Sequence, residues 1–570
     1  MKTVVLSLTV LALTLLQGCA SNHSLPFAGV NEAAPLEATY FDVEIPTHDG
    51  KTLTATVYQP ALEAGESAPL VVQTHGFGGF RSPRPMSIYG QLIVSGEAGL
   101  AAWRAGYWMI SYDQRGFGDS DGQVHLMDPD FEVADLSDVI DWAQDNLPRL
   151  ERDGPQDPVV GTVGESYGGA VQILASMRDP RIDAIVPIAT WYNLEESIAP
   201  QKTVRSAWGS FLASFGTFSS GFDFDMFYQD QYLALFGGSM NSAVATDLAR
   251  RSPATYCDAG QTVQADALFM QGFRDSLFAV NQGYHNWQCA RRSGHEARLI
   301  GLRDGHILPW PMQLWSGLPM FNTQPTVHCG DRQMATRQLV VAWFDRTLRG
   351  QRERLAQWPE LCVTFDDDSG EAVTELPTGG HTLPIRPSQV KLVQSGLFES
   401  ILAPLDSLWS LFVPAGDPLP AEQQENSGGW LRPTFIPLLE TDRAKRVVGI
   451  PVLDLDLETT TSAHDGAVFV ALGIQHSGQV GFEVLGEQYV PLVGDGHYHL
   501  DMPAVADRLR PGDTLGLVAQ GFTGQFFLSA EGFFSSATLK GQVQVPVHPV
   551  PQEAALATSN RRCCAGLSEK

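Results

Sequence analysis

The sequence predicts an α/β fold built on a parallel sheet, followed by an all-β domain. In the first part of the chain, short continuous apolar runs alternate with helix-like stretches, as in a sheet whose two faces are both covered by helices. From about Leu361 onward, strand-like segments separated by turns replace this alternation. Because 570 residues are too many for one compact core, several domains are expected.

Residues 1–19 have the pattern of a targeting segment and are kept out of the fold. A basic start precedes the apolar run 4–16, which is shorter than the roughly 20 residues that cross a bilayer. The run ends in Leu-Gln-Gly-Cys, which resembles the lipobox of bacterial lipoproteins. That resemblance implies cleavage before Cys19, acylation of Cys19 and anchoring in the cell envelope. Ala20 resembles the outer-membrane sorting pattern, and an ordinary cleaved signal peptide is the alternative.

A tether over residues 20–37 leads into a catalytic domain assigned to residues 38–190 and 263–350. Its expected strands are 40–46, 52–58, 70–73, 108–112, 159–163, 182–188, 267–270 and 298–302. Its expected helices are 131–146, 170–177, one that runs through Arg292, and a final one near 332–348.

Residues 191–262 interrupt the alternation and contain no clear strand. This segment is rich in Ser, Gly and aromatic residues, among them Phe211, Phe215, Phe218, Phe222, Phe224 and Phe227. An insertion at this place predicts a cap over one end of the sheet, although its aromatic residues can also form a small core of their own. After the catalytic domain, residues 361–548 are assigned to an all-β sandwich and residues 549–570 to a tail.

Four of the seven cysteines are expected to form disulfides. Cys19 is the predicted lipid site, and Cys563 and Cys564 are adjacent in the polar tail. The remaining four are an even number in an exported protein, where disulfides are permitted. Three pairings are possible, of which the spacing favours Cys257 with Cys289 and Cys329 with Cys362.

The composition argues against nucleic acid as a partner and gives no sign of a cofactor. The formal net charge is −27, and no run of Lys or Arg offsets it. No C-x-x-C or H-E-x-x-H pattern occurs, so no zinc site is predicted. The acidic run 366–368 is interpreted as a solvated turn rather than a calcium loop.

The predicted nucleophile is Ser166. A catalytic serine needs an exposed position, which the nucleophile elbow G-x-S-x-G provides at a sharp strand-to-helix turn. The pattern occurs at 118–122 and at 164–168. Ser166 directly follows the expected strand 159–163 and leads into a helix start with small residues, whereas Ser120 lies within a polar loop. This context predicts an α/β-hydrolase fold with Ser166 at the elbow.

The acid and the base of this fold follow the nucleophile in chain order, at the carboxyl ends of later strands. Asp275 follows the expected strand 267–270 and His306 follows 298–302, so these two residues are predicted to complete a triad. Capping of a helix N-terminus is the alternative role for Asp275. Three other histidines lack the required placement, namely His285, His295 and His328.

Two backbone N–H groups are predicted to form the oxyanion hole. One belongs to Tyr167, the residue after the nucleophile. The other is expected in the loop 75–79, which reads His-Gly-Phe-Gly-Gly and resembles the glycine-rich loops of lipases and esterases. Phe77 or Gly78 is the predicted second donor.

Together these motifs resemble the X-Pro dipeptidyl-peptidase and cocaine esterase (CocE/NonD) family of serine hydrolases. The resemblance extends from about residue 40 to 547, and its most specific segments are 49–50, 112–122, 164–169 and 343–350. It implies a helical cap, a C-terminal jelly-roll sandwich, and loop-organising roles for Asp113 and Arg115. The sequence departs from this family in one respect. Cocaine esterases place a tyrosine hydroxyl in the oxyanion hole, whereas this loop has Phe77.

The sequence therefore predicts a serine hydrolase that cleaves an ester or amide bond of a small molecule or peptide through an acyl-enzyme. An X-Pro dipeptidyl-peptidase would need a carboxylate for the substrate ammonium, and the candidates in the cap are Glu195, Glu196, Asp223 and Asp225. Esters, α-amino-acid esters and β-lactam amides stay open as substrates. The alternative from another class is a non-catalytic surface lipoprotein that binds ligands through its β-sandwich.

Overall fold

The computed structural model describes most of the chain between residues 34 and 550. The described ranges are 34–87, 93–221, 242–306, 325–392, 433–459, 467–521, 523–526 and 535–550, with residues 223 and 240. The predicted signal peptide with Cys19 and the cysteines of the tail lie outside these ranges.

A ten-stranded sheet forms the centre of the catalytic domain, in the order β1-β2-β4-β3-β7-β8-β9-β10-β13-β14. Its strands are β1 (Thr39–Pro46), β2 (Thr52–Gln59), β3 (Leu70–Thr74), β4 (Trp108–Tyr112), β7 (Val160–Glu165), β8 (Ile182–Ile188), β9 (Asp266–Gly272), β10 (Ala297–Leu302), β13 (Leu361–Thr364) and β14 (Gly370–Ala372). Neighbouring strands from β4 to β13 run parallel, whereas β1, β2 and β14 join antiparallel. The α/β class is confirmed.

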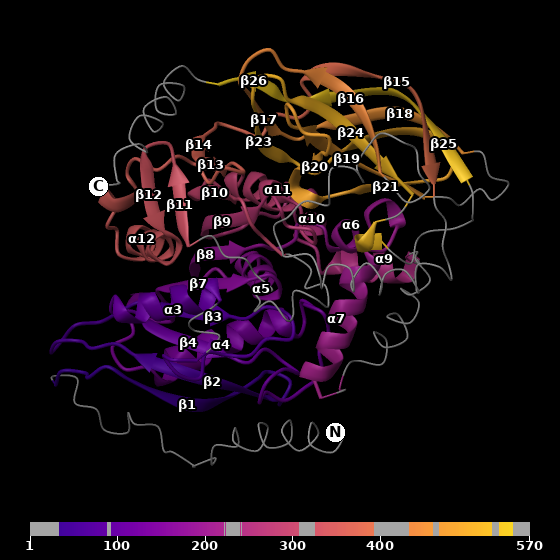
Figure 1. Cartoon of the computed structure of the whole chain (residues 1–570). Helices are drawn as coiled ribbons and strands as arrows, with labels where there is room; N and C mark the ends of the chain where they lie inside the picture. The colour runs from indigo at the N-terminus through magenta and orange to yellow at the C-terminus, as the bar shows by residue number, and fades with distance from the viewer. Residues whose placement is uncertain are drawn as a thin grey trace, which may run out of the picture.

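Helices cover both faces of this sheet, which explains why its inner strands are buried along their whole length (Figure 1). One core contains side chains of α4 (Glu132–Asn146), α5 (Tyr167–Ser176) and α11 (Val280–Arg291). A second core, against the other face, contains side chains of α3 (Val94–Arg104) and α12 (Thr336–Leu348). Both faces of the sheet are thus shielded from solvent, so a functional site is expected at the ends of its strands.

Two boundaries predicted from the sequence are wrong. The last helix begins at Thr336, because residues 332–335 form β12 (Arg332–Ala335), which pairs with β11 (Thr326–Cys329). The sandwich does not begin at residue 361, because β13 pairs parallel with β10 and β14 pairs with β13. A buried run of four apolar residues fits either domain, and only its pairing partner distinguishes them.

The segment between β8 and β9 is mainly helical where the structure describes it. Its helices are α6 (Leu194–Ile198), α7 (Ser206–Ser219), α9 (Ser242–Arg250) and α10 (Pro253–Asp258). Phe211 and Phe215 stack with ring centroids 5.5 Å apart, but Phe218 is 73% exposed. The described aromatic residues therefore do not all join one core. Phe222, Phe224 and Phe227 lie outside the described residues.

The C-terminal domain is an antiparallel β-sandwich, as predicted. Three groups of strands have the orders β15-β25-β18-β22, β16-β24-β19-β20 with β21 beside β19, and β23-β17-β26. Their bounds are β15 (His381–Leu392), β16 (Thr434–Glu440), β17 (Lys445–Gly449), β18 (Val452–Thr459), β19 (Ala467–Gln475), β20 (Glu483–Val484), β21 (Val490–Val493), β22 (Gly496–Asp501), β23 (Val505–Leu509), β24 (Thr514–Gln520), β25 (Ser535–Val545) and β26 (Val547–Pro549). These strands share one apolar core. Figure 1 shows the sandwich against the β13 end of the central sheet.

No described helix is long and apolar enough to cross a membrane.

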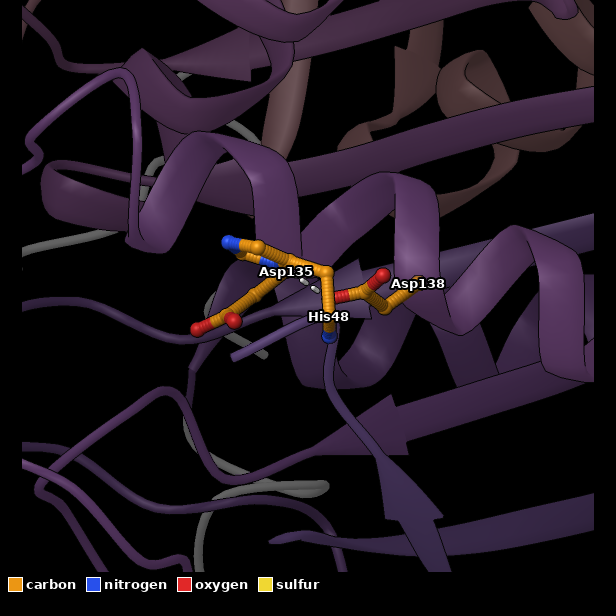
Figure 2. Close-up of side chains that lie close together, drawn as sticks. All are labelled: His48, Asp135 and Asp138. Atoms are coloured by element: carbon orange, nitrogen blue, oxygen red, sulfur yellow. Dashed lines mark hydrogen bonds and ion pairs between the residues drawn. The ribbon is translucent and has the colours of Figure 1, made fainter. Parts of the chain in front are cut away.

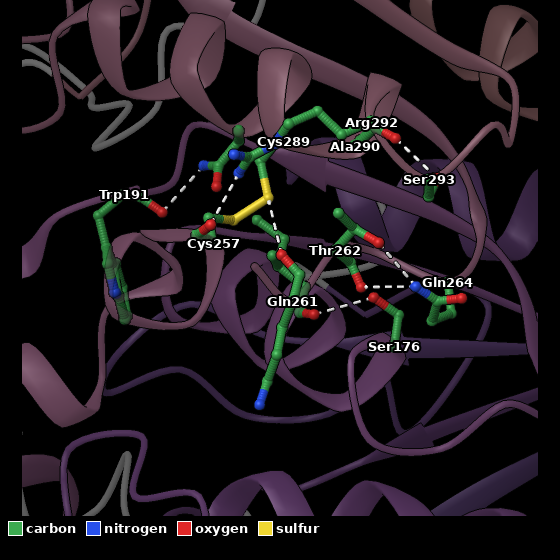
Figure 3. The surroundings of a disulfide bond; sticks show 12 residues. Ser176, Trp191, Cys257, Gln261, Thr262, Gln264, Cys289, Ala290, Arg292 and Ser293 are labelled. Atoms are coloured by element: carbon green, nitrogen blue, oxygen red, sulfur yellow. Dashed lines mark hydrogen bonds between the residues drawn. A yellow bond between two sulfur atoms is a disulfide. The ribbon is translucent and has the colours of Figure 1, made fainter. Parts of the chain in front are cut away.

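Two disulfides tie the catalytic domain together, in the pairing that the spacing favours. Cys257 of α10 bonds to Cys289 of α11, with Cα atoms 6.1 Å apart (Figure 3). Cys329 of β11 bonds to Cys362 of β13, with Cα atoms 6.0 Å apart. The first bond fastens the end of the cap segment to a helix that covers the sheet.

Replacing Cys257 and Cys289 together by Ala should lower stability by about 3 kcal/mol, because the bond closes a loop of 32 residues in the unfolded chain. Thermal unfolding should show a midpoint roughly 5–10 °C lower. The matched control replaces Cys563 and Cys564, which should leave the midpoint in place. Equal midpoints for wild type and the Cys257 and Cys289 double variant would contradict a stabilising bond.

Candidate active site

Ser166 lies at a strained turn between β7 and α5. Its backbone has φ +55° and ψ −115°, a conformation that L residues rarely adopt. Thr74 of β3 packs so closely against this turn that a Cβ at Gly164 would come within 2.0 Å of the Thr74 hydroxyl, and one at Gly168 within 2.6 Å of the Thr74 carbonyl oxygen. The glycines of the motif are therefore needed for packing. The turn is held by the Ser166 N–H, which donates to the Ile188 carbonyl at 2.8 Å.

Ser120, in the second match to the motif, has a structural role. Its hydroxyl donates to the Asp113 carbonyl at 2.6 Å and accepts from the Thr54 N–H at 2.8 Å. Asp113 forms an ion pair with Arg81 and accepts from the Asp119 N–H at 3.0 Å. Ser120 and Asp113 thus organise a loop, which is the role that the family resemblance implies for Asp113.

Asp275 and His306 are in direct contact. Asp275 follows β9, His306 follows β10, and the His306 Nδ1 lies 2.6 Å from the Asp275 Oδ2. Asp275 is fully buried and His306 is 3% exposed. A buried carboxylate beside Nδ1 favours the tautomer with a proton on that nitrogen, which leaves Nε2 as the basic atom.

Both roles considered for Asp275 occur together, on different oxygens. Its Oδ1 accepts from the N–H groups of Leu277 at 3.0 Å and Phe278 at 2.7 Å, so it caps the turn that follows. Its Oδ2 faces His306. The cap fixes the carboxylate, and the carboxylate in turn fixes the imidazole.

Ser166 lies at the same edge of the sheet as this pair. β7, β8, β9 and β10 are consecutive parallel neighbours, and Ser166, Asp275 and His306 all follow carboxyl ends of these strands. An aromatic series runs along this edge from Tyr167 through Trp191 and Phe278 to His306, with successive ring centroids 6.4, 5.4 and 5.2 Å apart. Open α/β sheets bind ligands at this edge.

The glycine-rich loop after β3 lies beside the elbow. The Phe77 ring meets the Tyr167 ring edge-on, with centroids 5.4 Å apart. Gly78 has φ +75°, and a Cβ there would come within 2.5 Å of the Phe215 ring of α7. The two segments predicted to supply oxyanion donors are therefore neighbours, and the cap helix α7 lies directly over one of them.

Glu165, which sequence reasoning missed, anchors this loop to the elbow. Its Oε1 accepts from the Gly76 N–H at 2.9 Å, and the side chain is 1% exposed. Its Oε2 has no partner among the described residues. Burial raises the pKa of the Glu165 carboxyl to about 8, so the group is neutral at pH 7. The only sequence signal was its place in the motif, where any residue type is allowed.

The cap carboxylates predicted as ammonium ligands are not buried where the structure describes them. Glu195 is half-buried, and Glu196 and Asp223 are exposed. Asp225 lies outside the described residues. The cap does contain a buried cation, Arg205, which is 5% exposed and whose charge interacts with that of Asp275.

A cluster of His48, Asp135 and Asp138 has the spacing of metal ligands but is accounted for by its own contacts (Figure 2). The His48 Nδ1 lies 2.8 Å from Asp138, and the hydrogen bond to Asp138 raises the pKa of His48. The Arg115 guanidinium forms ion pairs with the carboxylates of Asp135 and Asp49, each with an N–O distance of 2.6 Å. We therefore interpret this cluster as an ion-pair network that organises the loop before α4.

Sequence comparison finds a family match over the first part of the catalytic domain. Residues 49–220 match the model of the X-Pro dipeptidyl-peptidases (S15 family). The quorum-quenching protein AidA of Acinetobacter baumannii (strain MDR-ZJ06) is 27% identical over 168 residues, which are 29% of this chain and 49% of that protein. An uncharacterized 31.7 kDa protein of Escherichia coli is 30% identical over 118 residues, 21% of this chain. The chain spans 36% of the length of that relative.

Solved structures share the whole architecture. An aminopeptidase from a marine sediment Thaumarchaeota archaeon has a TM-score of 0.58 at 14% identity, over 93% of this chain and all of the other. An α-amino acid ester hydrolase has 0.60 at 13% identity, over 94% of this chain and all of the other. A CocE/NonD family hydrolase from Staphylococcus aureus has 0.57 at 12% identity, over 90% of this chain and 94% of the other. The chain has an α/β-hydrolase fold followed by an antiparallel β-sandwich, and its residues 49–220 are similar to the S15 family.

Replacing Glu165 by Gln should make folding stability less dependent on pH. The folded-state pKa of about 8 lies above the ordinary value of 4.5, so the stability that the neutral carboxyl contributes is full below pH 4.5 and is lost as the pH rises through 8. Between these values wild type should lose at most about 1.4 kcal/mol per pH unit relative to the variant. Denaturation curves at several pH values test this, with the exposed Glu37→Gln as control. Parallel pH curves for wild type and Glu165→Gln would contradict the assignment of a buried neutral acid.

Proposed function

We propose that the protein is a serine hydrolase that cleaves an ester or amide bond, with Ser166 as nucleophile, His306 as base and Asp275 as the residue that orients the imidazole. The observation that carries the proposal is the buried contact of 2.6 Å between His306 and Asp275, at the sheet edge where Ser166 occupies a strained elbow. The family match over residues 49–220 supports it. A lone structural histidine would not need this partner at this edge.

Catalysis proceeds by acyl transfer. His306 Nε2 removes the Ser166 proton as the hydroxyl oxygen attacks the substrate carbonyl, and the resulting imidazolium is stabilised by Asp275. Backbone N–H groups of Tyr167 and of Phe77 or Gly78 hold the oxyanion. His306 then gives the proton to the leaving group, which departs as an alcohol or amine. Water, deprotonated by His306, attacks the acyl-enzyme and releases the acid.

A hydrogen bond connects the glycine-rich loop to the elbow and so fixes the relative positions of the two proposed oxyanion donors. Neutral Glu165 accepts from Gly76, one residue before Phe77, and so links the loop to the residue before the nucleophile. The strained backbone at Ser166 forms the sharp turn between strand and helix that exposes the hydroxyl of a nucleophile elbow. Preorganised donors of this kind contribute about 3–4 kcal/mol each to lowering the barrier.

The substrate is proposed as a small ester or amide, with an X-Pro dipeptide amide as the second candidate. The second candidate is favoured by the description of the matched family. The X-Pro substrate is disfavoured because Glu196 and Asp223 are exposed, whereas binding of an ammonium group is strongest to a carboxylate that is shielded from solvent. Among the similar proteins are an aminopeptidase and an α-amino acid ester hydrolase, so both amide and ester substrates are assayed below.

We also propose that the mature chain is anchored by lipid at Cys19 in the outer membrane. The support is the lipobox-like end of the apolar run 4–16. A non-catalytic surface lipoprotein that binds ligands through its sandwich is the rival function, and it shares the anchor but not the reactive serine.

A fluorophosphonate probe tests the hydrolase assignment. Wild type should be labelled covalently, whereas Ser166→Ala should not be, because the probe reacts with an activated serine hydroxyl. The matched control is Ser120→Ala, which should keep its labelling. Failure of folded wild type to react, or equal labelling of Ser166→Ala, would support the non-catalytic alternative. Comparing Gly-Pro-anilide with short acyl esters on the same preparations then decides between the two substrate classes.

Growth with labelled palmitate tests the anchor. Wild type should incorporate the label and partition with membranes, and Cys19→Ala should do neither, because several acyl chains are needed for stable attachment. Cys563→Ala is the control for non-specific acylation. Label retained by Cys19→Ala would refute the proposed site.

A further inference from the structure

A buried tryptophan of the cap packs against the proposed base. Trp208, in the first turn of α7, is 3% exposed, and its ring meets the His306 imidazole edge-on with centroids 5.8 Å apart. The Phe278 ring also meets this imidazole edge-on, with centroids 5.2 Å apart. Because protein interiors are closely packed, two buried rings in contact with the imidazole limit the directions in which it can turn. The cap therefore helps to set the orientation of His306.

The indole N–H of Trp208 connects the cap to the loop that carries the triad acid. Its Nε1 donates to the Ser276 Oγ at 3.1 Å, and Ser276 is the residue directly after Asp275. The Ser276 hydroxyl in turn donates to the carbonyl oxygen of His306 at 3.0 Å. One side-chain hydroxyl thus links a cap helix, the loop after β9 and the backbone of the proposed base.

The chemistry of the three groups fixes the direction of these hydrogen bonds. An indole N–H can only donate and a carbonyl oxygen can only accept, whereas a serine hydroxyl has one proton to give. The Ser276 hydroxyl accepts from Trp208, so its own proton is directed to the His306 carbonyl. The backbone N–H of Ser276 donates to the same carbonyl at 3.0 Å. Both Trp208 and Ser276 are buried, so water competes little for these bonds.

The end of α7 that carries Trp208 is itself held in place. Arg205, the residue before this helix, donates to the Ser197 carbonyl within the cap and to the Gln525 Oε1 of the sandwich, each at 3.0 Å. Trp208 lies only three residues further along the chain, in the first helical turn. The indole that reaches Ser276 therefore projects from a helix end with a fixed position.

We propose that Trp208 and Ser276 are positioning residues for His306, which they hold by a relay of hydrogen bonds from the cap to the His306 carbonyl. The inference rests on the proposed function of His306 as the base. Asp275 fixes the imidazole at Nδ1, whereas the relay fixes the backbone from which the imidazole projects. Proton transfer from Ser166 requires Nε2 within hydrogen-bond distance of the hydroxyl, so a small displacement of this backbone slows acylation.

The test is a double-mutant cycle on the rate at which the fluorophosphonate probe labels Ser166 in the full chain, with all variants held below their unfolding midpoints. Ser276→Ala and Trp208→Phe should each lower the limiting rate at saturating probe roughly tenfold, with the half-saturating probe concentration unchanged. Trp208→Phe keeps an aromatic ring but has no N–H to donate. The double variant should label no more slowly than the slower single variant, because both changes break the same relay.

The matched control is Trp103→Phe in α3, which removes an indole N–H that donates to the Gln59 carbonyl at 2.7 Å and should label at the wild-type rate. Three results would overturn the proposal: single variants within about twofold of the wild-type rate, rate losses that multiply in the double variant, or a change confined to the half-saturating concentration. If folded wild type itself is not labelled, the hydrolase assignment fails and this inference fails with it.

Discussion

The contact between Asp275 and His306 is the constraint on which the arrangement of the site depends. It requires that the loops after two adjacent parallel strands, β9 and β10, approach within hydrogen-bond distance. Glycines make this approach possible: a Cβ at Gly272 would come within 1.8 Å of the Asp304 carbonyl oxygen, and one at Gly305 within 2.5 Å of the Asp275 Cβ. Backbone bonds then lock the loops together, since the Ser276 N–H donates to the His306 carbonyl at 3.0 Å. The sheet thus builds the acid and base as one rigid unit.

A second buried charge, that of Arg205, connects the cap with the sandwich and acts on this unit. Arg205 of the cap donates to the Ser197 carbonyl and to the Gln525 Oε1 of the sandwich, each at 3.0 Å, and its guanidinium lies 5.2 Å from the centre of the Phe526 ring. Its charge interacts with that of Asp275, while burial lowers the pKa of Arg205 to about 10. The sandwich therefore helps to hold a buried cation whose charge acts on Asp275. Elsewhere a buried charge is paired with opposite charges, as Arg115 is with Asp49 and Asp135.

Much of the fold and of the candidate site follows from the order of short motifs along the chain. The positions of Ser166, Asp275 and His306 could be predicted because each follows a buried apolar run at the same edge of the sheet. Other features depend on contacts between distant segments and leave no local pattern. Residues 361–364 read as a sandwich strand until their pairing with β10 is known. Glu165 reads as a variable motif position, and only its bond to Gly76 assigns it a role.

The most direct test of the central claim is the rate at which an active-site titrant acylates Ser166 in Asp275→Asn, measured by stopped flow beside wild type. If the Asp275 carboxylate fixes the His306 tautomer, the acylation rate should fall by about 10³ to 10⁴, with unfolding midpoint and titrant affinity nearly unchanged. A folded variant that acylates within about tenfold of the wild-type rate would contradict the account, because His306 would then act without its buried partner.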